Sequence, residues 1–228
     1  MSLGTALVSV DVVPFQVHNQ VLQVLTQRQI LKSGAKGLVL PSGRIDPQQD
    51  LSLNDTAQRL LEQAALTPAS YYEQVTTIGN AQRDSRGWSV TVVYYALLNR
   101  ASISHPAETT EWINVIEGCP ERKLAYDHNS LVKEALERLR NKIQYSSLPV
   151  YLLPEEFTLS DIQNVFAVLL GKAPPMRSIR NRFLRGEVLQ ETGTYRRGNC
   201  RPAALYRANQ QSEAFHFDRL YLSTQASA

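Results

Sequence analysis

The sequence predicts an α+β protein: an α/β/α sandwich with a mixed sheet over residues 1–148, followed by a winged helix-turn-helix domain over residues 149–228. The first supporting observation is that strand-like segments rich in Val, Leu and Tyr alternate with two amphipathic helical patterns in residues 1–148. The second is that an arginine-rich helical pattern near the C-terminus is followed by two short strand-like segments. A chain of 228 residues has room for two domains of ordinary size.

The first strands are indicated by two segments dense in Val and Leu. Residues 7–15 and 21–25 have this composition, and Asn19 lies between them, which is typical of two strands joined by a turn. A third strand is expected to end near Leu40, because the segment 41–43 reads Pro-Ser-Gly and breaks it.

A helix should follow, since Ser52-Leu-Asn-Asp is an N-cap signal. Apolar residues then recur at helical spacing and predict a core-facing stripe, formed by Ala57, Leu60, Leu61 and Ala64. Two more strands are predicted over residues 72–78 and 89–98. The second is dense in Val and Tyr, so we expect it to be buried on both faces.

A second amphipathic helix is predicted to start near Asp127 and to end near Ile143. Its apolar face consists of Val132, Ala135, Leu136 and Leu139. This helix closes the first domain. Pro149 and Pro154 bracket the next segment, which the sequence predicts to be extended and to connect the two domains.

The second domain opens with Thr158-Leu-Ser-Asp, a capping box that predicts a helix start. The apolar face of this helix is formed by Leu159, Ile162, Val165, Phe166, Leu169 and Leu170. Gly171 and the pair Pro174-Pro175 are expected to end it.

A further helix is predicted over residues 176–184, with Ile179 and Phe183 turned inward. This leaves solvent access for Arg177, Arg180, Asn181 and Arg182. Residues 188–193 and 201–207 read as two short strands flanking a turn around Arg197. A helix followed by such a hairpin is typical of a recognition helix with a wing.

The charge of this region predicts contact with DNA. Nine basic residues lie between Lys172 and Arg207, against only Glu187 and Glu191, although the whole chain has a formal net charge of only +3. A phosphate-binding surface needs such local density. The candidate DNA-binding residues are Arg177, Ser178, Arg180, Asn181, Arg182, Arg185, Arg196, Arg197 and Arg201. The alternative is that these arginines merely solvate the outside of a helical subdomain.

Other functional classes receive no support from the sequence. Cys119 and Cys200 lie far apart and the four histidines are scattered, so no metal site is expected. No stretch approaches the roughly 18 uncharged apolar residues of a membrane span. Residues 1–5 have no features of a secretion leader, so we expect the protein to act in the cytoplasm without a membrane role.

The first domain resembles the Nudix superfamily over about residues 6–99. In that family a glycine after a strand precedes a helix whose glutamates hold divalent metal against a diphosphate. Gly43 matches the glycine and Glu62 matches one glutamate, but Arg59 and Gln63 stand where the family has two others. The helix fits the motif only with one extra residue before it, which puts Gln49 or Asp50 near the earliest glutamate.

This erosion of the motif argues against hydrolysis. Residues 59, 62 and 63 share one helix face, which offers one cation, one carboxylate and one amide in place of a carboxylate cluster. Mg²⁺ requires oxygen ligands and would be repelled by an arginine. The sequence therefore predicts a protein that is not an enzyme. A plain amphipathic helix with a solvated outer face would give the same pattern, and only the resemblance distinguishes the two.

The segment 82–88, Gln-Arg-Asp-Ser-Arg-Gly-Trp, resembles the Arg-Asp-Pro-Arg-Gly segment of ADP-ribose-directed Nudix proteins, with serine in place of proline. Arg83 and Arg86 could face a diphosphate as bidentate donors. Asp84 and Gly87 could instead only shape a turn. Two further arginines, Arg28 and Arg44, could also reach a bound phosphate.

The combination of segments resembles the NrtR family, Nudix-related transcriptional regulators of NAD metabolism. The resemblance rests on the eroded motif, Asp127-His128 leading a helix, Phe157-Thr-Leu, and Arg-Pro-Ala-Ala-Leu-Tyr-Arg from Arg201. The family's recognition helix commonly reads Arg-Asn-Phe-Arg-Arg-Lys, which corresponds to residues 177–182 here. Ser178 and Asn181 depart from this pattern, so the operator sequence can differ from that of relatives.

This resemblance implies a DNA-binding repressor of NAD metabolism genes that binds a palindromic operator as a homodimer. It also implies that the first domain senses ADP-ribose or a related nucleotide and needs no cofactor. The implied effector-binding residues are Arg28, Arg44, Glu62, Arg83, Asp84 and Arg86. The alternative function is an active Mg²⁺-dependent Nudix hydrolase of ADP-ribose or nucleoside diphosphate derivatives, fused to a helical domain.

Overall fold

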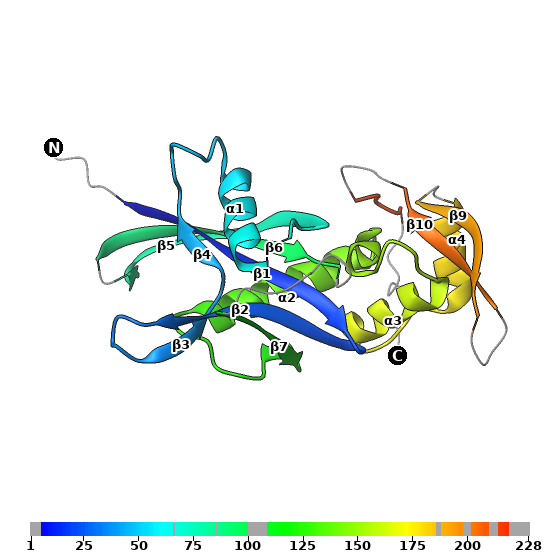
Figure 1. Ribbon diagram of the computed structural model, residues 1–228, viewed down its shortest axis with the longest axis horizontal. Coiled ribbons are helices and arrows are strands. Elements are labelled where there is room, and N and C mark those ends of the chain that lie inside the picture. The colour runs from blue at the N-terminus through cyan, green and yellow to red at the C-terminus, as the bar shows by residue number, and fades with distance from the viewer. Residues whose placement is uncertain are drawn as a thin grey trace, which may run out of the picture. The chain divides into compact units, whose positions relative to one another are not determined.

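The computed structural model describes residues 6–65, 67–84, 86–99, 109–185, 188–197, 202–209 and 214–218. The chain divides into two compact units (Figure 1). The first unit ends at Glu137, and the second continues from Arg138 and also includes Val17–Val21.

The first unit is built on a mixed sheet. Within the described residues, eight strands form this sheet in the order β5-β6-β1-β2-β7-β8, with β3 on β2 and β4 on β1. They are β1 (Leu7–His18), β2 (Val21–Ile30), β3 (Lys36–Val39), β4 (Ser42–Arg44), β5 (Tyr71–Asp84), β6 (Gly87–Leu97), β7 (Thr110–Ile116) and β8 (Cys119–Pro120). Strand β1 runs parallel to β6, whereas β5 pairs with β6 antiparallel, which makes the sheet mixed as predicted.

The turn predicted at Asn19 is present. Asn19 and Gln20 both have positive φ angles, 50° and 61°, and they alone separate β1 from β2. A two-residue connection of this kind matches the right-handed twist of the strands that it joins. The sequence patterns did not predict β4, β7 or β8, the second of which lies next to β2 in the sheet.

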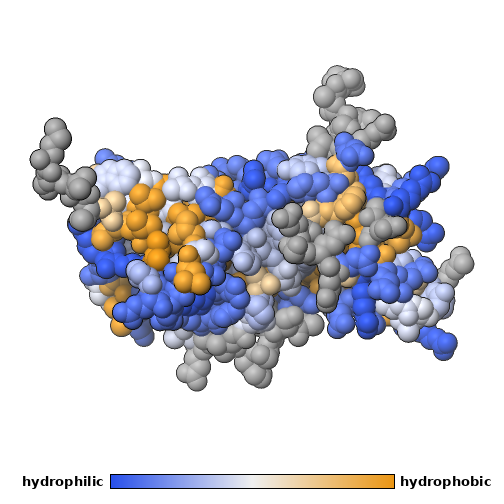
Figure 2. Space-filling model, turned by 90° about the horizontal axis from the view of Figure 1, so that it is seen from above, coloured by the Kyte–Doolittle hydropathy of each residue, from blue (hydrophilic) through white to orange (hydrophobic). Residues whose placement is uncertain are grey.

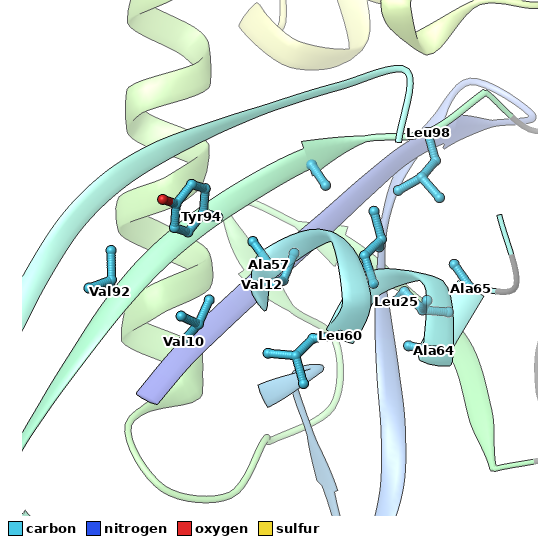
Figure 3. Packing of buried hydrophobic residues seen from close by; sticks show 12 residues of the cluster. Val10, Val12, Leu25, Ala57, Leu60, Ala64, Ala65, Val92, Tyr94 and Leu98 are labelled. Carbon is cyan, nitrogen blue, oxygen red and sulfur yellow. The ribbon is translucent and has the colours of Figure 1, made fainter. Parts of the chain in front are cut away.

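One face of the sheet is covered by α1 (Leu53–Ala65), the helix that carries the eroded Nudix motif. The predicted stripe of this helix is buried against β1, β2 and β6, as Figure 3 shows. The cluster contains Val10, Val12, Leu25, Ala57, Leu60, Leu61, Ala64, Ala65, Val92, Tyr94, Ala96 and Leu98. Gly43 permits this packing, because a Cβ there would lie 2.7 Å from Cδ2 of Leu60.

The opposite face of the sheet carries the start of α2 (His128–Ile143), which lies behind the strands in Figure 3. Side chains alternate between the two faces of a strand, so Asp11, between Val10 and Val12, points away from α1. Its carboxylate Oδ1 faces the His128 ring, with Nε2 at 3.6 Å. The two helices therefore enclose the sheet, as expected for an α/β/α sandwich.

The second unit begins with a correction to the sequence prediction. The segment between Pro149 and Pro154 was expected to be extended, but Leu148–Leu152 forms the 3₁₀ helix η2. Pro149 lies in its first turn, where the fixed φ of proline suits a helix start and its missing N–H costs nothing. Pro149 therefore starts a short helix and does not interrupt one.

The remaining elements of this unit agree with the predicted winged helix. They are α3 (Leu159–Leu170), α4 (Met176–Arg185), β9 (Leu189–Arg196) and β10 (Ala203–Ala208). The Thr158 hydroxyl accepts from the Asp161 N–H and the Asp161 carboxylate accepts from the Thr158 N–H, so the predicted capping box forms. Helix α3 ends at Gly171, whose φ of 72° is left-handed.

The core of the second unit joins both helices to residues 214–218. The rings of Phe166 and Phe183 meet edge to face with centroids 6.4 Å apart, and Phe217 lies 5.3 Å from Phe183. Two backbone bonds, from Ser147 N–H to Phe215 and from Phe217 N–H to Tyr145, fix this segment. No helix among the described residues is long and apolar enough to cross a membrane.

Candidate functional site

The outer face of α1 is organised by an ion pair between Arg59 and Asp50. Arg59 Nε donates to Oδ1 of Asp50 at 2.8 Å, and Nη2 donates to Oδ2. The same carboxylate accepts from the Thr56 hydroxyl at 2.8 Å and from the Asp46 N–H at 2.9 Å. The bond from Arg59 holds the pKa of Asp50 well below its usual range. Asp50 is therefore a charged carboxylate that already accepts four hydrogen bonds.

The other residues of the eroded motif lie close to this pair. Glu62 is exposed and accepts from Gln58 Nε2 at 2.8 Å. Arg44 is exposed on β4, and its backbone carbonyl accepts from Arg59 Nη2 at 3.2 Å. A shallow cavity of about 350 Å³ is lined by Gln49, Asp50, Leu51, Asp55, Gln58, Arg59 and Glu62. Of the predicted effector-binding residues, Glu62 thus belongs to the α1 face, whereas the side chain of Arg44 points to the opposite face, because the neighbouring Gly43 faces Leu60.

Arg83 lies in a different place and has different partners. Its Nε donates to Oδ2 of Asp127 and its Nη2 donates to Oδ2 of Asp11, both at 2.7 Å. The Thr91 hydroxyl also donates to Asp11, at 2.6 Å. The side chain of Arg83 is only 13% exposed, so most of the guanidinium is taken up by protein partners. Burial opposes its charge, but the bonds to Asp127 and Asp11 leave the pKa of Arg83 raised.

His128 completes this network. Its Nδ1 accepts from the Leu40 N–H at 2.8 Å, so any ring proton of the neutral form is on Nε2, facing Asp11. Burial lowers the pKa of His128 and keeps the ring neutral. Arg83, from the segment that resembles ADP-ribose-directed Nudix proteins, and Asp127-His128, from the NrtR resemblance, are thus parts of one cluster around Asp11.

The tip of the β5–β6 hairpin carries another exposed group. Arg86 Nε donates to Oδ1 of Asp84 at 3.0 Å, and Lys32 Nζ donates to the same atom at 3.0 Å. The bonds from Arg86 lower the pKa of Asp84 well below its usual range. Arg28 lies elsewhere again, on β2, where its Nη2 donates to Glu111 at 2.7 Å.

The six predicted effector-binding residues are therefore not gathered into one site. Leu25 packs in the cluster under α1, so Arg28, three residues along the same strand, points to the opposite face. Glu62 lies on the α1 side, whereas the side chain of Arg44 points to the other face and Arg83 belongs to the network that faces α2.

Helix α4 presents the predicted cationic surface. Ile179 and Phe183 are fully buried, as the sequence predicted. The exposed residues of the helix include Arg177, Arg180, Asn181 and Arg185, and Ser178 is half-buried. Figure 2 shows hydrophilic side chains over much of the surface at the end of the molecule where α4 and β9 lie.

Arg182 differs from its neighbours on α4. It is half-buried, its Nη1 donates to the Gln144 carbonyl at 3.0 Å, and its guanidinium lies 5.7 Å from the centre of the Phe217 ring. These contacts are all within the second unit. They turn Arg182 towards the protein rather than towards solvent.

The predicted wing contains two described arginines, both exposed, and one of them is paired with a carboxylate. Arg196 Nη1 donates to both carboxylate oxygens of Asp161, at 3.1 and 2.9 Å. Arg197 is exposed at the end of β9. Arg201, the third arginine assigned to the wing, lies outside the described residues.

Sequence reasoning missed the carboxylates that organise these groups, namely Asp11, Asp127 and Asp161 as partners of arginines. For Asp11 a signal was present, since a carboxylate between two valines of a buried strand requires a partner. Among the described residues, no group of three or more His, Cys, Asp or Glu side chains is placed to hold a metal ion.

Comparison with known proteins identifies the second unit first. Residues 149–208 match the family model of the NrtR DNA-binding winged helix domain. Over 218 residues the chain is 38% identical to the ADPR responsive transcriptional repressor NtrR of Acinetobacter baylyi, covering 94% of this chain and 86% of that protein.

The chain is also similar to Shewanella oneidensis NrtR, with a TM-score of 0.86 and 37% identity over 94% of this chain and 99% of the other. The same protein complexed with a 27mer DNA gives a TM-score of 0.83 at 37% identity, covering 89% and 93% of the two chains. Its NUDIX domain complexed with ADP ribose gives 0.51 at 34% identity, covering 60% and 90%. These likenesses confirm the predicted fold class of both parts.

Proposed function

The chain belongs to the NrtR family of transcriptional regulators, and we propose that it is a DNA-binding repressor of NAD metabolism genes that responds to ADP-ribose. The relatives support both halves of this proposal. The Acinetobacter protein is an ADPR responsive repressor, and Shewanella NrtR has been captured with DNA and, through its NUDIX domain, with ADP ribose.

The observation that carries the DNA-binding role is the asymmetry of α4. This helix buries Ile179 and Phe183 completely while it exposes three arginines and an asparagine: Arg177, Arg180, Asn181 and Arg185. It is the second helix of the α3–α4 pair, which is the position of a recognition helix. Arginine can bind guanine bidentately and asparagine can bind adenine, so this face has the donors that reading base edges requires.

The remaining candidates have supporting parts in this proposal. Arg197 and Arg196 would hold phosphates from the wing, together with Arg201, and Ser178 would contribute at the edge of the α4 face. Asp161 neutralises part of the charge of Arg196, so Arg197 is the stronger phosphate ligand of the two described wing arginines. We assign Arg182 to orienting α4, because the Gln144 carbonyl and the Phe217 ring already occupy its guanidinium.

A hydrolase would need an Mg²⁺ site on the face of α1, and the residues there do not fit one. Arg59 places a guanidinium against Asp50, the carboxylate closest to the motif, and Thr56 and the Asp46 N–H use the rest of its acceptors. A hard cation binds carboxylate oxygens, and the guanidinium of Arg59 against Asp50 would repel it. The absence of hydrolysis also suits a sensor, since hydrolysis would destroy the signal.

We place the effector in the first unit. Glu62 on the α1 face, Arg44 on β4, and the exposed Arg86 with its half-buried partner Asp84 at the hairpin tip remain candidates for direct contacts. Arg83 supports the site from within the network around Asp11. ADP-ribose can release DNA only if it binds the DNA-free arrangement more tightly than the DNA-bound one.

A homodimer on a palindromic operator completes the proposal. Two recognition helices must reach half-sites about one helical turn, roughly 34 Å, or a multiple of it apart. Figure 2 shows apolar side chains gathered on one part of the surface of the first unit, amid hydrophilic ones. Such patches are frequent at protein–protein interfaces. In this proposal residues 1–148 form the effector-sensing domain and residues 149–228 form the DNA-binding domain.

The test is a gel shift with a duplex from the DNA upstream of the protein's own gene, and a scrambled duplex as control. We expect selective retardation that ADP-ribose relieves. The variant Arg177→Ala/Arg180→Ala should lose the retardation, whereas Lys133→Ala, an exposed change on α2, should keep it. Failure to retard any duplex overturns DNA binding, and retardation that ADP-ribose leaves unchanged overturns the effector assignment alone. Phosphate release from ADP-ribose with Mg²⁺ and phosphatase tests the hydrolase alternative.

A further inference from the structure

A cavity of about 380 Å³ lies beside the β2–β3 hairpin of the first unit, and the function proposed above does not use it. We call it the β2–β3 cavity. It is lined by Arg28, Gln29, Ile30, Lys36, Gly37, Leu38, Arg122 and Lys123. Its volume lies within the range of small-molecule sites, which is about 300–1,000 Å³.

The wall of this cavity is strongly cationic. Arg28 and Arg122 share the carboxylate of Glu111, with N–O distances of 2.7 and 2.6 Å. This shared partner fixes the two guanidinium groups next to each other while leaving both more than half exposed. Lys36 and Lys123 are exposed, and neither is joined to a carboxylate within the part of the chain that the structure describes. Among the described residues, the carboxylate of Glu111 thus balances only part of the charge of the four basic residues that line the cavity.

The cavity also has an apolar part. Leu38, opposite Arg28 in the β2–β3 pairing, is only 5% exposed and is covered by neighbouring chain, while its surface still contributes to the lining. Ile30, which also lines the cavity, is 71% exposed and adds apolar surface to it. Cations around an apolar floor fit a ligand with a charged end and an apolar or aromatic body.

The position of the cavity separates it from the α1 face. The side chain of Leu25 is buried under α1, so Arg28 and its neighbour across the hairpin, Leu38, point to the other side of the sheet. The Leu38 carbonyl accepts from the Ala125 N–H at 2.8 Å, which holds the segment of Arg122 and Lys123 against β3 on that side. A ligand in the cavity therefore does not occupy the eroded Nudix motif.

We propose that the β2–β3 cavity binds a phosphorylated small molecule with at least two negative charges, at a site separate from that of the ADP-ribose effector. The two arginines fixed by Glu111 offer paired N–H groups suited to phosphate oxygens. The two lysines add further positive charge to the lining of the cavity. Nucleic acid phosphates share this chemistry, but a bounded cavity with an apolar floor selects a small ligand over a continuous backbone.

The experiment is a calorimetric titration of the full-length chain with inorganic pyrophosphate, repeated with AMP and with adenosine. The variant Lys36→Glu/Lys123→Glu reverses two charges of the cavity wall, and Lys133→Glu, also exposed and in the first unit, is the matched control. We expect pyrophosphate and AMP to bind and adenosine not to bind. The double variant should lose affinity by about 10-fold or more, because each reversal replaces an attraction by a repulsion, and Lys133→Glu should bind as the parent does.

Two further arms fix the position and the kind of ligand. Pyrophosphate should still bind when the protein is saturated with ADP-ribose, and competition between them would overturn the claim of a separate site. Operator affinity should be the same in Lys36→Glu/Lys123→Glu and Lys133→Glu, and a selective loss in the former would make the surface a DNA contact instead. Absence of pyrophosphate binding, or binding that the double variant retains, overturns the proposal without touching the repressor function.

Discussion

Arg83 donates to Asp127 across 44 residues of sequence, with Nε 2.7 Å from Oδ2, and this bond ties the β5–β6 hairpin to the residue that precedes α2. The same guanidinium reaches Asp11 on β1, 72 residues away. Helix α2 then continues past Glu137 into the second unit as far as Ile143. Arg83 thus helps to hold the start of a helix that belongs to both units, together with the bond from the Leu40 N–H to His128.

Removing Arg83 should cost more stability than removing the charge of Asp127. Arg83→Ala leaves the Asp11 carboxylate, only 3% exposed, without its cation, and we expect a loss of about 2–4 kcal/mol. Asp127 is 34% exposed, so Asp127→Asn should cost only about 1 kcal/mol. Urea unfolding of the two variants measures the difference. Equal losses would show that Asp11 does not depend on Arg83.

His128 should make the stability depend on pH in the mildly acidic range. Burial lowers the pKa of His128 in the folded protein below its ordinary value of 6.5, although Asp11 and Asp127 oppose the shift and Arg83 adds to it. The unfolded chain therefore binds the proton first, and stability falls as the pH drops below about 6.5, by up to about 1.4 kcal/mol per pH unit. His128→Asn removes this titration, and its unfolding free energy should be flatter between pH 6.5 and 5.

The carboxylates with lowered pKa values affect the stability in a lower pH range than His128 does, so the two contributions can be measured separately. Asp50 and Asp84 contribute stability above their ordinary pKa of 3.8 and lose it as the pH falls further. A parent protein whose stability is level from pH 6.5 to 5 would contradict the role given to His128.

Substitutions at Arg180 and Arg182 should affect different properties, the first DNA binding and the second stability. Arg180 is exposed, so Arg180→Ala should weaken operator binding with a change in unfolding free energy within about 0.5 kcal/mol. If Arg180 contacts a phosphate, the slope of log affinity against log salt concentration should fall by roughly 1. Arg182→Ala should instead lower the unfolding free energy by about 1–2 kcal/mol, since it removes the bond to Gln144 and the contact with Phe217.

Thermal unfolding and fluorescence anisotropy with labelled operator measure the two properties on the same samples. If Arg182→Ala leaves stability unchanged and abolishes DNA binding, its assignment to orienting α4 is wrong and it reads DNA directly.

A carboxylate in place of Arg59 should make the stability of the protein depend on Mg²⁺. Arg59→Glu puts a second carboxylate beside Asp50, and we expect repulsion and the loss of the ion pair to lower the melting temperature. Millimolar Mg²⁺ should recover part of that loss, because clustered carboxylates attract hard cations. The melting temperature of the parent protein should not respond to Mg²⁺, and Arg59→Gln, which adds no charge, serves as the control. A parent that Mg²⁺ stabilises would reopen the hydrolase function.

The sequence by itself determined the elements whose signals are local. Apolar periodicity located α1, α2, α3 and α4, and the Thr158–Asp161 capping box set the start of α3. These features depend on residues three or four positions apart, and the physics that forms them acts over one helical turn. The prediction of an extended segment at Pro149 was wrong, because the fixed φ of proline can end one element and begin another.

Only the tertiary structure decided which charges are available to ligands. Arg83, Arg182 and Arg180 look alike in the sequence, yet the first is enclosed by Asp11 and Asp127, the second faces Gln144 and Phe217, and the third is exposed. The partners of the first two lie between 35 and 72 residues away, so no local pattern announces them. An ion pair or a buried guanidinium is defined by distance and desolvation, and both quantities exist only once the chain has folded.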